Sequence, residues 1–125
     1  MEEQREQLRV AWVDTDASGR IHFTAAFRWA EATEISLYRR LDLLRGGGSD
    51  FPRRQVEAEF RRMLAFEDEV EVLLRVARLG TTSITYRWEI RKDGEVAIDG
   101  GHTVVHVGPD GRPAPLADVF RTRLG

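Results

Sequence analysis

Residues 13–23 read VDTDASGRIHF, and they join two stretches of different hydrophobic periodicity. Before them, residues 8–14 alternate with the period of two that is typical of a strand. After them, apolar side chains recur every three or four positions, as on one face of an amphipathic helix. The sequence therefore predicts a strand that leads through a loop into a long helix, with Thr24 as its N-cap.

The predicted helix ends in a glycine-rich stretch. Its apolar positions are Ala26, Phe27, Ala30, Ile35, Tyr38, Leu41 and Leu44. Three consecutive glycines, residues 46–48, follow, and they lose too much conformational entropy to remain helical. Pro52 comes shortly after them, which is a further stop signal.

The second half of the chain has the periodicity of strands. Two-residue alternation or β-branched enrichment marks residues 55–64, 69–79, 81–91 and 95–107. Gly80 with Thr81 supplies one turn, and the Asp93-Gly94 pair supplies another in which positive φ angles suit a tight hairpin. Residues 115–124 carry a weak helical pattern that could cover the edge of the sheet.

This order of elements predicts an α+β fold in a single domain, residues 1–125, with a five-stranded antiparallel sheet and one long helix. A lone helix is too small to cover one face of such a sheet. We therefore expect a second copy to bury the remaining apolar surface, in a homodimer or a homotetramer.

The composition excludes several functions. The chain has 125 residues, 42% of them hydrophobic and 32% charged, with a net charge of −2, which does not favour binding to nucleic acid. It contains no cysteine, so disulfides, thiolate nucleophiles and zinc–thiolate sites are excluded. The N-terminus lacks the pattern of a secretory signal, and no apolar run has the length of a membrane span. These features predict a cytoplasmic protein that does not associate with membranes.

The loop and the helix together carry a recognisable motif. Its members are Asp16, Gly19, Ile21, His22, Phe23 and, within the helix, Glu31. Further along, residues 65–70 (AFEDEV) and 79–83 (LGTTS) follow the same pattern. In these stretches the sequence resembles the hotdog-fold thioesterases of the 4-hydroxybenzoyl-CoA thioesterase type. The resemblance implies a sheet wrapped around the helix and hydrolysis of an acyl-CoA thioester, with no cofactor beyond the coenzyme A of the substrate.

The resemblance also implies roles for two residues of the loop. Asp16 would act as nucleophile or general base, and the backbone N–H of Phe23 would polarise the thioester carbonyl. These roles have a physical basis, because the first N–H groups of a helix lack partners and carry the positive end of its dipole. Gly19 lets the loop fold back, so that the carboxylate faces these amides across a small gap. Asp14 is expected to be structural.

Three other residues are candidates for contact with the acyl group. His22 is a departure from the family pattern, and it either contacts the substrate or satisfies a loop carbonyl, the second being favoured. Phe27 lies early on the helix and is a candidate for lining an acyl pocket. Glu31 either faces the substrate or pairs with an arginine, and pairing is favoured.

The coenzyme A moiety needs basic and hydroxyl groups for its phosphates. The candidates are Arg61, Arg62, Arg78, Thr81, Thr82 and Ser83. His102 and His106 would lie on the same face of one strand, but no acidic or sulfur ligand is evident near them, so we expect no metal site.

Two alternatives remain open. The acyl group could be carried by an acyl carrier protein instead of coenzyme A. The domain could also bind an acyl-CoA or an acyl carrier protein without turnover, which the departure at His22 and Phe23 keeps open. The hotdog dehydratases are disfavoured, because Ile21 stands where the histidine of their Asp-x4-His pattern would follow Asp16.

Overall fold

The computed structural model of the protein describes residues 1–44 and 51–125. In chain order the elements are β1 (Glu3–Arg9), a 3-10 turn (Trp12–Asp14), α1 (Thr24–Arg40), β2 (Arg53–Phe60), β3 (Glu69–Leu79), β4 (Ser83–Lys92), β5 (Glu95–Val105) and α2 (Asp118–Leu124).

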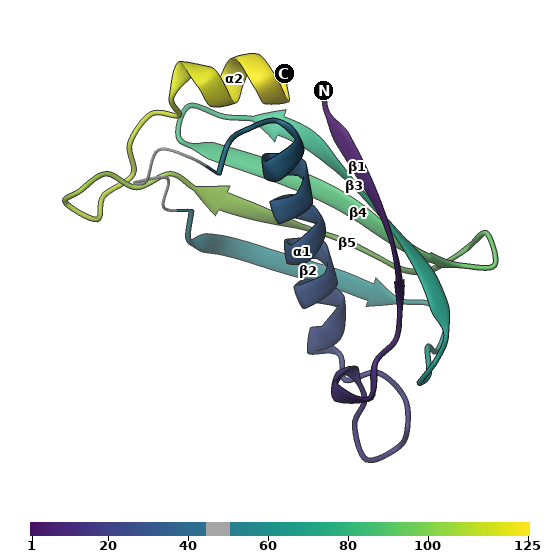
Figure 1. Ribbon diagram of the computed structural model, residues 1–125. Helices are drawn as coiled ribbons and strands as arrows, with labels where there is room; N and C mark the ends of the chain where they lie inside the picture. The colour runs from purple at the N-terminus through teal and green to yellow at the C-terminus, as the bar shows by residue number, and fades with distance from the viewer. Residues whose placement is uncertain (45–50) are drawn as a thin grey trace.

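The five strands form one antiparallel sheet in the order β1-β3-β4-β5-β2. The sheet curves around α1, which lies against its concave face, and α2 covers one end of the sheet (Figure 1). The predicted α+β architecture with a five-stranded antiparallel sheet and a helix is therefore confirmed. β1 and β2 are the two edge strands.

The core lies between α1 and the three central strands. Alternate residues of β3 and β4 are buried, as a strand with one covered face requires. The helix contributes Ala25, Ala26 and Ala30, all fully buried, and these small side chains let its backbone approach the sheet closely. Trp88 and Tyr86 of β4 are the largest fully buried side chains in the described ranges.

The first strand differs from its prediction. β1 ends at Arg9, and the alternating residues 12–14 form a 3-10 turn instead of a strand. The Asp14 carboxylate accepts a hydrogen bond from the N–H of Ala11 at 2.9 Å, which closes this turn. The polar sequence of β1 is stable as an edge strand because its charged side chains pair across to β3, with Arg5 on Glu71 and Arg9 on Glu69.

The long helix is shorter than predicted, with 17 residues, and it ends at Arg40 rather than at Leu44. The Leu43 N–H donates to the Tyr38 carbonyl at 2.8 Å and the Asp42 N–H donates to the Arg39 carbonyl at 3.3 Å. With Asp42 at a positive φ of 56°, these two bonds form a Schellman cap. The predicted stop at residues 46–48 lies outside the described residues.

The start of the helix also differs by one residue. α1 begins at Thr24, and the cap position belongs to Phe23, whose side chain cannot accept a hydrogen bond. The prediction of Thr24 as N-cap is therefore wrong. The neighbouring His22 side chain takes over this role, because its Nδ1 atom accepts from the Thr24 N–H at 3.3 Å.

The later elements follow the prediction closely. β3 has the predicted limits, and β2, β4 and β5 differ by a few residues at their ends. Asp93 and Gly94 both have positive φ, as expected for the β4–β5 hairpin. The weak helical pattern near the C-terminus corresponds to α2, which buries Phe120 and Leu124.

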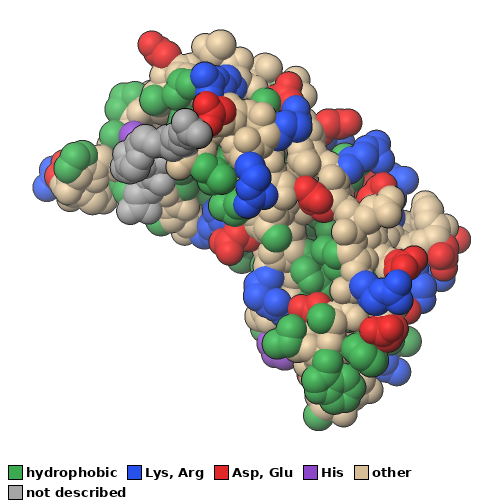
Figure 2. Space-filling model, viewed as in Figure 1, with side chains coloured by type: hydrophobic (Ala, Val, Ile, Leu, Met, Phe, Trp, Pro, Cys, Tyr) green, Lys and Arg blue, Asp and Glu red, His purple; other side chains and the backbone are tan. Residues whose placement is uncertain are grey.

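Apolar surface is left exposed at one end of the molecule. Trp12, Val13, Phe23 and Met63 are 60% to 78% exposed. In Figure 2 hydrophobic side chains gather at the end where the loop before α1 lies. None of the helices in residues 1–44 and 51–125 is long and apolar enough to cross a membrane.

Candidate active site

The loop before α1 is a small hairpin. The His22 N–H donates to the Asp14 carbonyl at 2.7 Å, Thr15 forms a bridge with Ile21, and the Asp16 N–H donates to the Arg20 carbonyl at 2.8 Å. Gly19 closes the turn with a φ of 82°, which a residue with a side chain rarely adopts. This ladder folds residues 14–16 back along residues 20–22, next to the start of α1.

The carboxylate of Asp16 is ionised and exposed in the single chain. Its Oδ1 atom accepts hydrogen bonds from the Ser18 hydroxyl at 2.5 Å and from the Ser18 N–H at 2.8 Å. These two bonds hold the pKa of Asp16 below its ordinary value. The group is therefore negatively charged at neutral pH, and its second oxygen, Oδ2, accepts no hydrogen bond from the described residues.

The N–H of Phe23 stands at the start of α1. Within the described part of the chain it has no hydrogen-bond acceptor, as expected of the first amides of a helix. The Phe23 ring is 60% exposed and lies against the His22 ring, with centroids 4.7 Å apart. The free amide is thus available to an oxygen atom of a ligand at the N-terminal end of the helix.

His22 serves the start of the helix. Its Nδ1 atom lies 2.7 Å from the Thr24 hydroxyl and 3.3 Å from the Thr24 N–H, so that it is an acceptor and carries its proton on Nε2. The prediction that His22 satisfies a loop carbonyl is therefore wrong. Asp14, by contrast, is structural as expected, since it is buried and pairs with Arg28 at 3.0 Å.

A groove of about 320 Å³ runs from the start of α1 along the edge strand β2. We call it the α1–β2 groove. Thr24, Phe27, Arg28 and Glu31 line it from α1, Arg53 and Val56 from β2, and His102 from β5. Phe27 is one of its lining residues, and the Phe27 ring contacts that of Trp88 edge-on, with centroids 5.9 Å apart.

Glu31 lies at the far end of the groove and is paired as predicted. Its Oε2 atom is 3.3 Å from Nη2 of Arg53, although the Glu31 side chain remains 62% exposed. It also faces the groove, so that the two alternatives considered for Glu31 are compatible.

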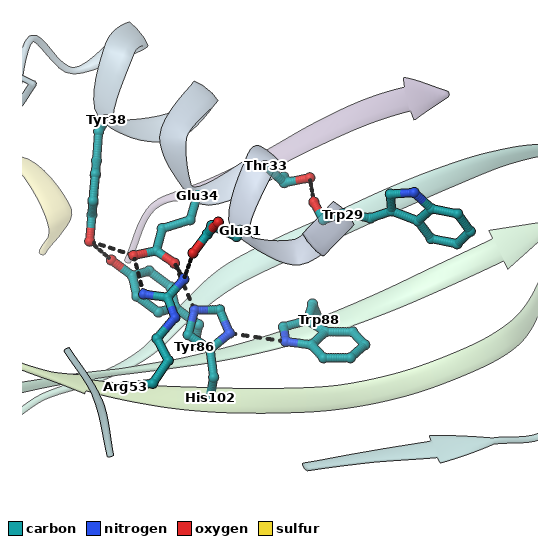
Figure 3. Close-up of polar contacts among 9 residues, drawn as sticks. All are labelled: Trp29, Glu31, Thr33, Glu34, Tyr38, Arg53, Tyr86, Trp88 and His102. Atoms are coloured by element: carbon teal, nitrogen blue, oxygen red, sulfur yellow. Dashed lines mark hydrogen bonds and ion pairs between the residues drawn. The ribbon is translucent and has the colours of Figure 1, made fainter. Parts of the chain in front are cut away.

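Below Glu31 lies a buried polar network that the sequence did not predict (Figure 3). At its centre is Glu34, whose carboxylate accepts four hydrogen bonds. The donors are His102 Nε2 at 2.8 Å, Arg53 Nη2 at 2.7 Å, Arg53 Nη1 at 3.4 Å and the Tyr38 hydroxyl at 3.0 Å. The Tyr38 hydroxyl also lies 2.5 Å from that of Tyr86.

The donors and acceptors of this network fix its proton positions. The indole N–H of Trp88 is only a donor, so Nδ1 of His102, 3.2 Å away, must accept. The proton of a neutral His102 is then on Nε2, which donates to Glu34. Burial alone would raise the pKa of Glu34, but the bonds from His102 and Arg53 outweigh it and hold the pKa below its ordinary value. Burial and the nearby Glu34 carboxylate raise the pKa of Tyr38, which stays protonated.

The six candidates for coenzyme A binding fall into two groups at opposite ends of the sheet. Arg61 and Arg62 follow β2 near the Asp16 loop, whereas Arg78 and residues 81–83 lie at the β3–β4 hairpin. The eleven residues of β3 separate the groups by roughly 35 Å. A single chain therefore does not bring all six residues to one site.

The members of these groups differ in their partners. Arg61 pairs with Asp99 at 2.8 Å and with Glu59 at 3.1 Å, and Arg62 pairs with Glu95. Arg78 is exposed and forms no ion pair with any residue of the described ranges. The β3–β4 hairpin is held in place by the C-terminal segment, since the carbonyl of Thr81 accepts a hydrogen bond from the Leu116 N–H at 3.0 Å.

The two histidines of β5 and its extension are not equivalent. His102 is bonded to Glu34, so the expectation that no acidic group lies near it is wrong. His106 follows the end of β5, and its Nδ1 atom lies 3.1 Å from the Ala114 carbonyl. The described residues contain no group of three or more His, Cys, Asp or Glu side chains that could hold a metal ion.

One signal for the buried network was present in the sequence. Glu34 lies four residues after Ala30 and four before Tyr38, which places it on the apolar stripe of the helix. A charged side chain in the middle of a core stripe needs a buried partner. The partner itself, His102, is 68 residues away, and no local pattern connects the two positions.

A sheet that wraps around one helix in this topology is the hotdog fold. The family model of the thioesterase superfamily matches residues 18–98, more than half of the chain. The chain belongs to this superfamily and is therefore a thioesterase, an enzyme that hydrolyses thioesters. No curated protein matches the sequence significantly.

Solved structures agree with this assignment. The chain is 28% identical to a thioesterase from Thermus thermophilus solved in complex with coenzyme A and Zn, with a TM-score of 0.85 over 97% of this chain and 96% of that one. A predicted thioesterase from Bacillus stearothermophilus is 25% identical, with a TM-score of 0.88 over 98% and 94%. A 1,4-dihydroxy-2-naphthoyl-CoA thioesterase from Synechocystis is 17% identical and shares the fold, with a TM-score of 0.91 over 98% and 96%.

Proposed function

We propose that this thioesterase hydrolyses acyl-CoA to the free acid and coenzyme A, with Asp16 as the catalytic carboxylate and the Phe23 N–H as the donor to the carbonyl oxygen. The observation that carries the proposal is the hairpin of residues 14–22. It folds an ionised carboxylate back towards the start of a helix whose first amide is unpaired. A carboxylate and a free main-chain donor are the two groups that thioester hydrolysis requires.

The reaction can be written with these groups alone. The Asp16 carboxylate takes a proton from water as the water oxygen attacks the carbonyl carbon, and the negative oxygen that develops accepts the Phe23 N–H. The carbon–sulfur bond then breaks, and the thiolate of coenzyme A takes up the proton. Alternatively, Asp16 attacks directly, and water hydrolyses the resulting anhydride. Neither route uses a cofactor other than the coenzyme A of the substrate.

Coenzyme A is favoured as the carrier by one comparison. The Thermus thermophilus thioesterase, at 28% identity, is described as a complex with coenzyme A. Arg61 and Arg62 lie on the same side of the molecule as the Asp16 loop, and arginine suits the phosphates of the nucleotide. The acyl group would enter the α1–β2 groove, past His22 and along Phe27 towards Glu31. An acyl carrier protein remains the alternative carrier.

A second copy of the chain would complete this site. The Asp16 loop is exposed in one chain, beside the exposed apolar side chains of Trp12, Val13 and Phe23. Both faces of the edge strand β2 are also exposed, which leaves it free to pair. Antiparallel pairing of two such edges reverses one sheet relative to the other. It would bring the β3–β4 hairpin of one copy, with Arg78 and residues 81–83, towards the Asp16 loop of the other, in a homodimer or in a tetramer of two dimers.

One observation favours the non-catalytic alternative. Asp16 faces solvent in the single chain, and a carboxylate in bulk water is a weak base towards a thioester. The alternative is a domain that binds acyl-CoA or an acyl carrier protein without turnover.

Kinetics of one variant distinguish hydrolysis with Asp16 as the catalytic carboxylate from binding without turnover. Asp16→Asn should lower kcat/KM for acyl-CoA esters at least about 100-fold, with an unchanged circular dichroism spectrum. The matched control is Asp110→Asn, because Asp110 holds a similar exposed turn through the Arg112 N–H at 3.0 Å, in a different loop. Wild-type turnover by Asp16→Asn, or no hydrolysis of any acyl-CoA by the native chain, would contradict the proposal.

A further inference from the structure

The turn between β3 and β4, residues 80–82, is bound by side-chain and backbone donors of the C-terminal segment. Nη2 of Arg121, on α2, donates to the Gly80 carbonyl at 2.5 Å and to the Thr81 carbonyl at 3.0 Å. The Thr81 carbonyl also accepts a hydrogen bond from the Leu116 N–H at 3.0 Å. In Figure 1 α2 lies across the end of the sheet that carries this turn. The two carbonyls therefore face the C-terminal segment.

The orientation of these carbonyls determines that of the neighbouring amides. A trans peptide is planar, and its C=O and N–H point in opposite directions. Because the carbonyls of Gly80 and Thr81 face the C-terminal segment, the N–H groups of the next residues, Thr81 and Thr82, face away from it. Neither N–H has an acceptor within residues 1–44 and 51–125. The turn thus presents two consecutive unpaired donors, an arrangement that suits an anion.

The surroundings of these amides are positively charged. Arg78, at the end of β3, is exposed, and Arg121 uses only its Nη2 atom for the two carbonyls. Neither arginine has an ion-pair partner in the parts of the chain that the structure describes. Arg61, by contrast, is paired with the carboxylate of Asp99. Unpaired arginines beside free amides favour a phosphate group as the ligand of the turn.

Arg123 offers a comparison within the same short helix. Its Nη1 atom donates to the carbonyls of Leu41 and Asp42, at 3.0 Å and 2.9 Å, just after the end of α1. Arg121 and Arg123 thus each hold two consecutive carbonyls from α2. They differ in what they hold, because only Arg121 binds the β3–β4 turn.

We propose that Arg121 is a positioning residue for the binding of coenzyme A, an inference that rests on the function proposed above. By holding the carbonyls of Gly80 and Thr81, it directs the N–H groups of the turn at a phosphate of the substrate. The turn lies at the opposite end of the sheet from the Asp16 loop of its own chain. Arg121 therefore serves the active site of the second copy.

Kinetics with two carriers of the same acyl group test this role. An acyl-CoA and the corresponding acyl-pantetheine differ only in the phosphates and the nucleotide. The wild type should have a KM for the CoA ester at least about tenfold below that for the pantetheine ester. Arg121→Met should raise KM for the CoA ester about tenfold at an unchanged kcat, and should leave the pantetheine ester unaffected. Arg121→Lys keeps a donor for the carbonyls and should recover part of the loss.

The matched control is Arg123→Met, which should leave KM for both esters unchanged. A rise of KM that is equal in Arg123→Met and Arg121→Met would overturn the inference, because α2 would then act through stability alone. Equal KM values for the two esters in the wild type would also overturn it, and would leave thioester hydrolysis intact. Hydrolysis of neither ester would overturn the inference and the proposed function together.

Co-expression of two variants tests the action across copies. A mixed dimer of an Arg121→Met chain and an Asp16→Asn chain contains one site with an intact Asp16 and the intact turn of the other chain. The mixed sample should therefore recover the low KM for the CoA ester, at a reduced kcat. A mixed sample that keeps the high KM of Arg121→Met would overturn the assignment of Arg121 to the site of the second copy.

Discussion

Glu34 of α1 and His102 of β5 share a hydrogen bond of 2.8 Å between two side chains that are almost completely buried. The bond crosses the interface between helix and sheet, and Arg53 joins it from the edge strand β2 at 2.7 Å. Three elements are thus linked through one carboxylate. Burial of a charge is tolerated here because every acceptor position of the carboxylate is satisfied.

The first prediction concerns the contribution of this carboxylate to stability. Glu34→Gln should lower the free energy of unfolding by about 2 to 4 kcal/mol, because it leaves the partly buried Arg53 without its main counter-charge. Glu31→Gln removes the exposed partner of the same guanidinium and should cost less than about 1 kcal/mol. Urea unfolding of both variants provides the comparison. Equal losses would mean that burial does not distinguish the two ion pairs.

The second prediction is a pH dependence of the same residue. The pKa of Glu34 is lowered in the folded protein, so folding favours the ionised form. Its contribution is complete above the unfolded pKa of glutamate, about 4.3, and is lost as the pH falls below that value through the folded pKa. Stability should therefore fall more steeply below about pH 4.3 in the wild type than in Glu34→Gln. Parallel curves for the two proteins would rule out this coupling.

The elements of this fold were predictable from local patterns. β3 has the predicted limits because its side chains alternate between core and solvent over most of its length, from Glu69 to Val76. The predicted first strand lay too far along the chain. The seven residues of β1 are mostly polar, and only their pairing with β3 makes them a strand. The end of α1 was predicted too far along the chain, because a Schellman cap with Asp42 at positive φ ends the helix before the glycines.

The site was predictable only in part. The order of Asp16, Gly19 and Phe23 in the sequence was enough to propose a loop that returns to the helix. The partners of Glu34 could not be identified, because helix, edge strand and inner strand meet only in the folded chain. The candidates Arg61 and Arg78 look equivalent in the sequence, yet the antiparallel path of the chain places them at opposite ends of the sheet.

The third prediction concerns Ser18, which holds the Asp16 carboxylate. Its hydroxyl is the main cause of the lowered pKa of Asp16, ahead of its N–H. Ser18→Ala should therefore raise this pKa towards the ordinary value for aspartate, about 3.9, and move the acid limb of kcat/KM to higher pH. Ser18→Thr keeps the hydroxyl and serves as the control. An acid limb that stays in place in Ser18→Ala would argue against Asp16 as the titrating group.

The fourth prediction is that hydrolysis does not depend on a metal ion. The described residues offer no cluster of ligands, and the proposed reaction needs only a carboxylate and an amide. Dialysis against a chelator should leave kcat/KM unchanged, and added Zn²⁺ should not raise it. A loss of activity that Zn²⁺ restores would require a different mechanism.

The fifth prediction connects the oligomeric state to activity. Val13 is 78% exposed at the apolar end of the molecule, next to the Asp16 loop, and a second copy should cover it. Val13→Asp should shift the protein from dimer or tetramer to monomer in sedimentation and reduce turnover, because a charge at this position is costly to bury. Val119→Asp places the same charge on α2, where the valine is 40% exposed, and should change neither property. A wild-type chain that is monomeric at assay concentrations and still hydrolyses acyl-CoA would show that one chain contains the whole site.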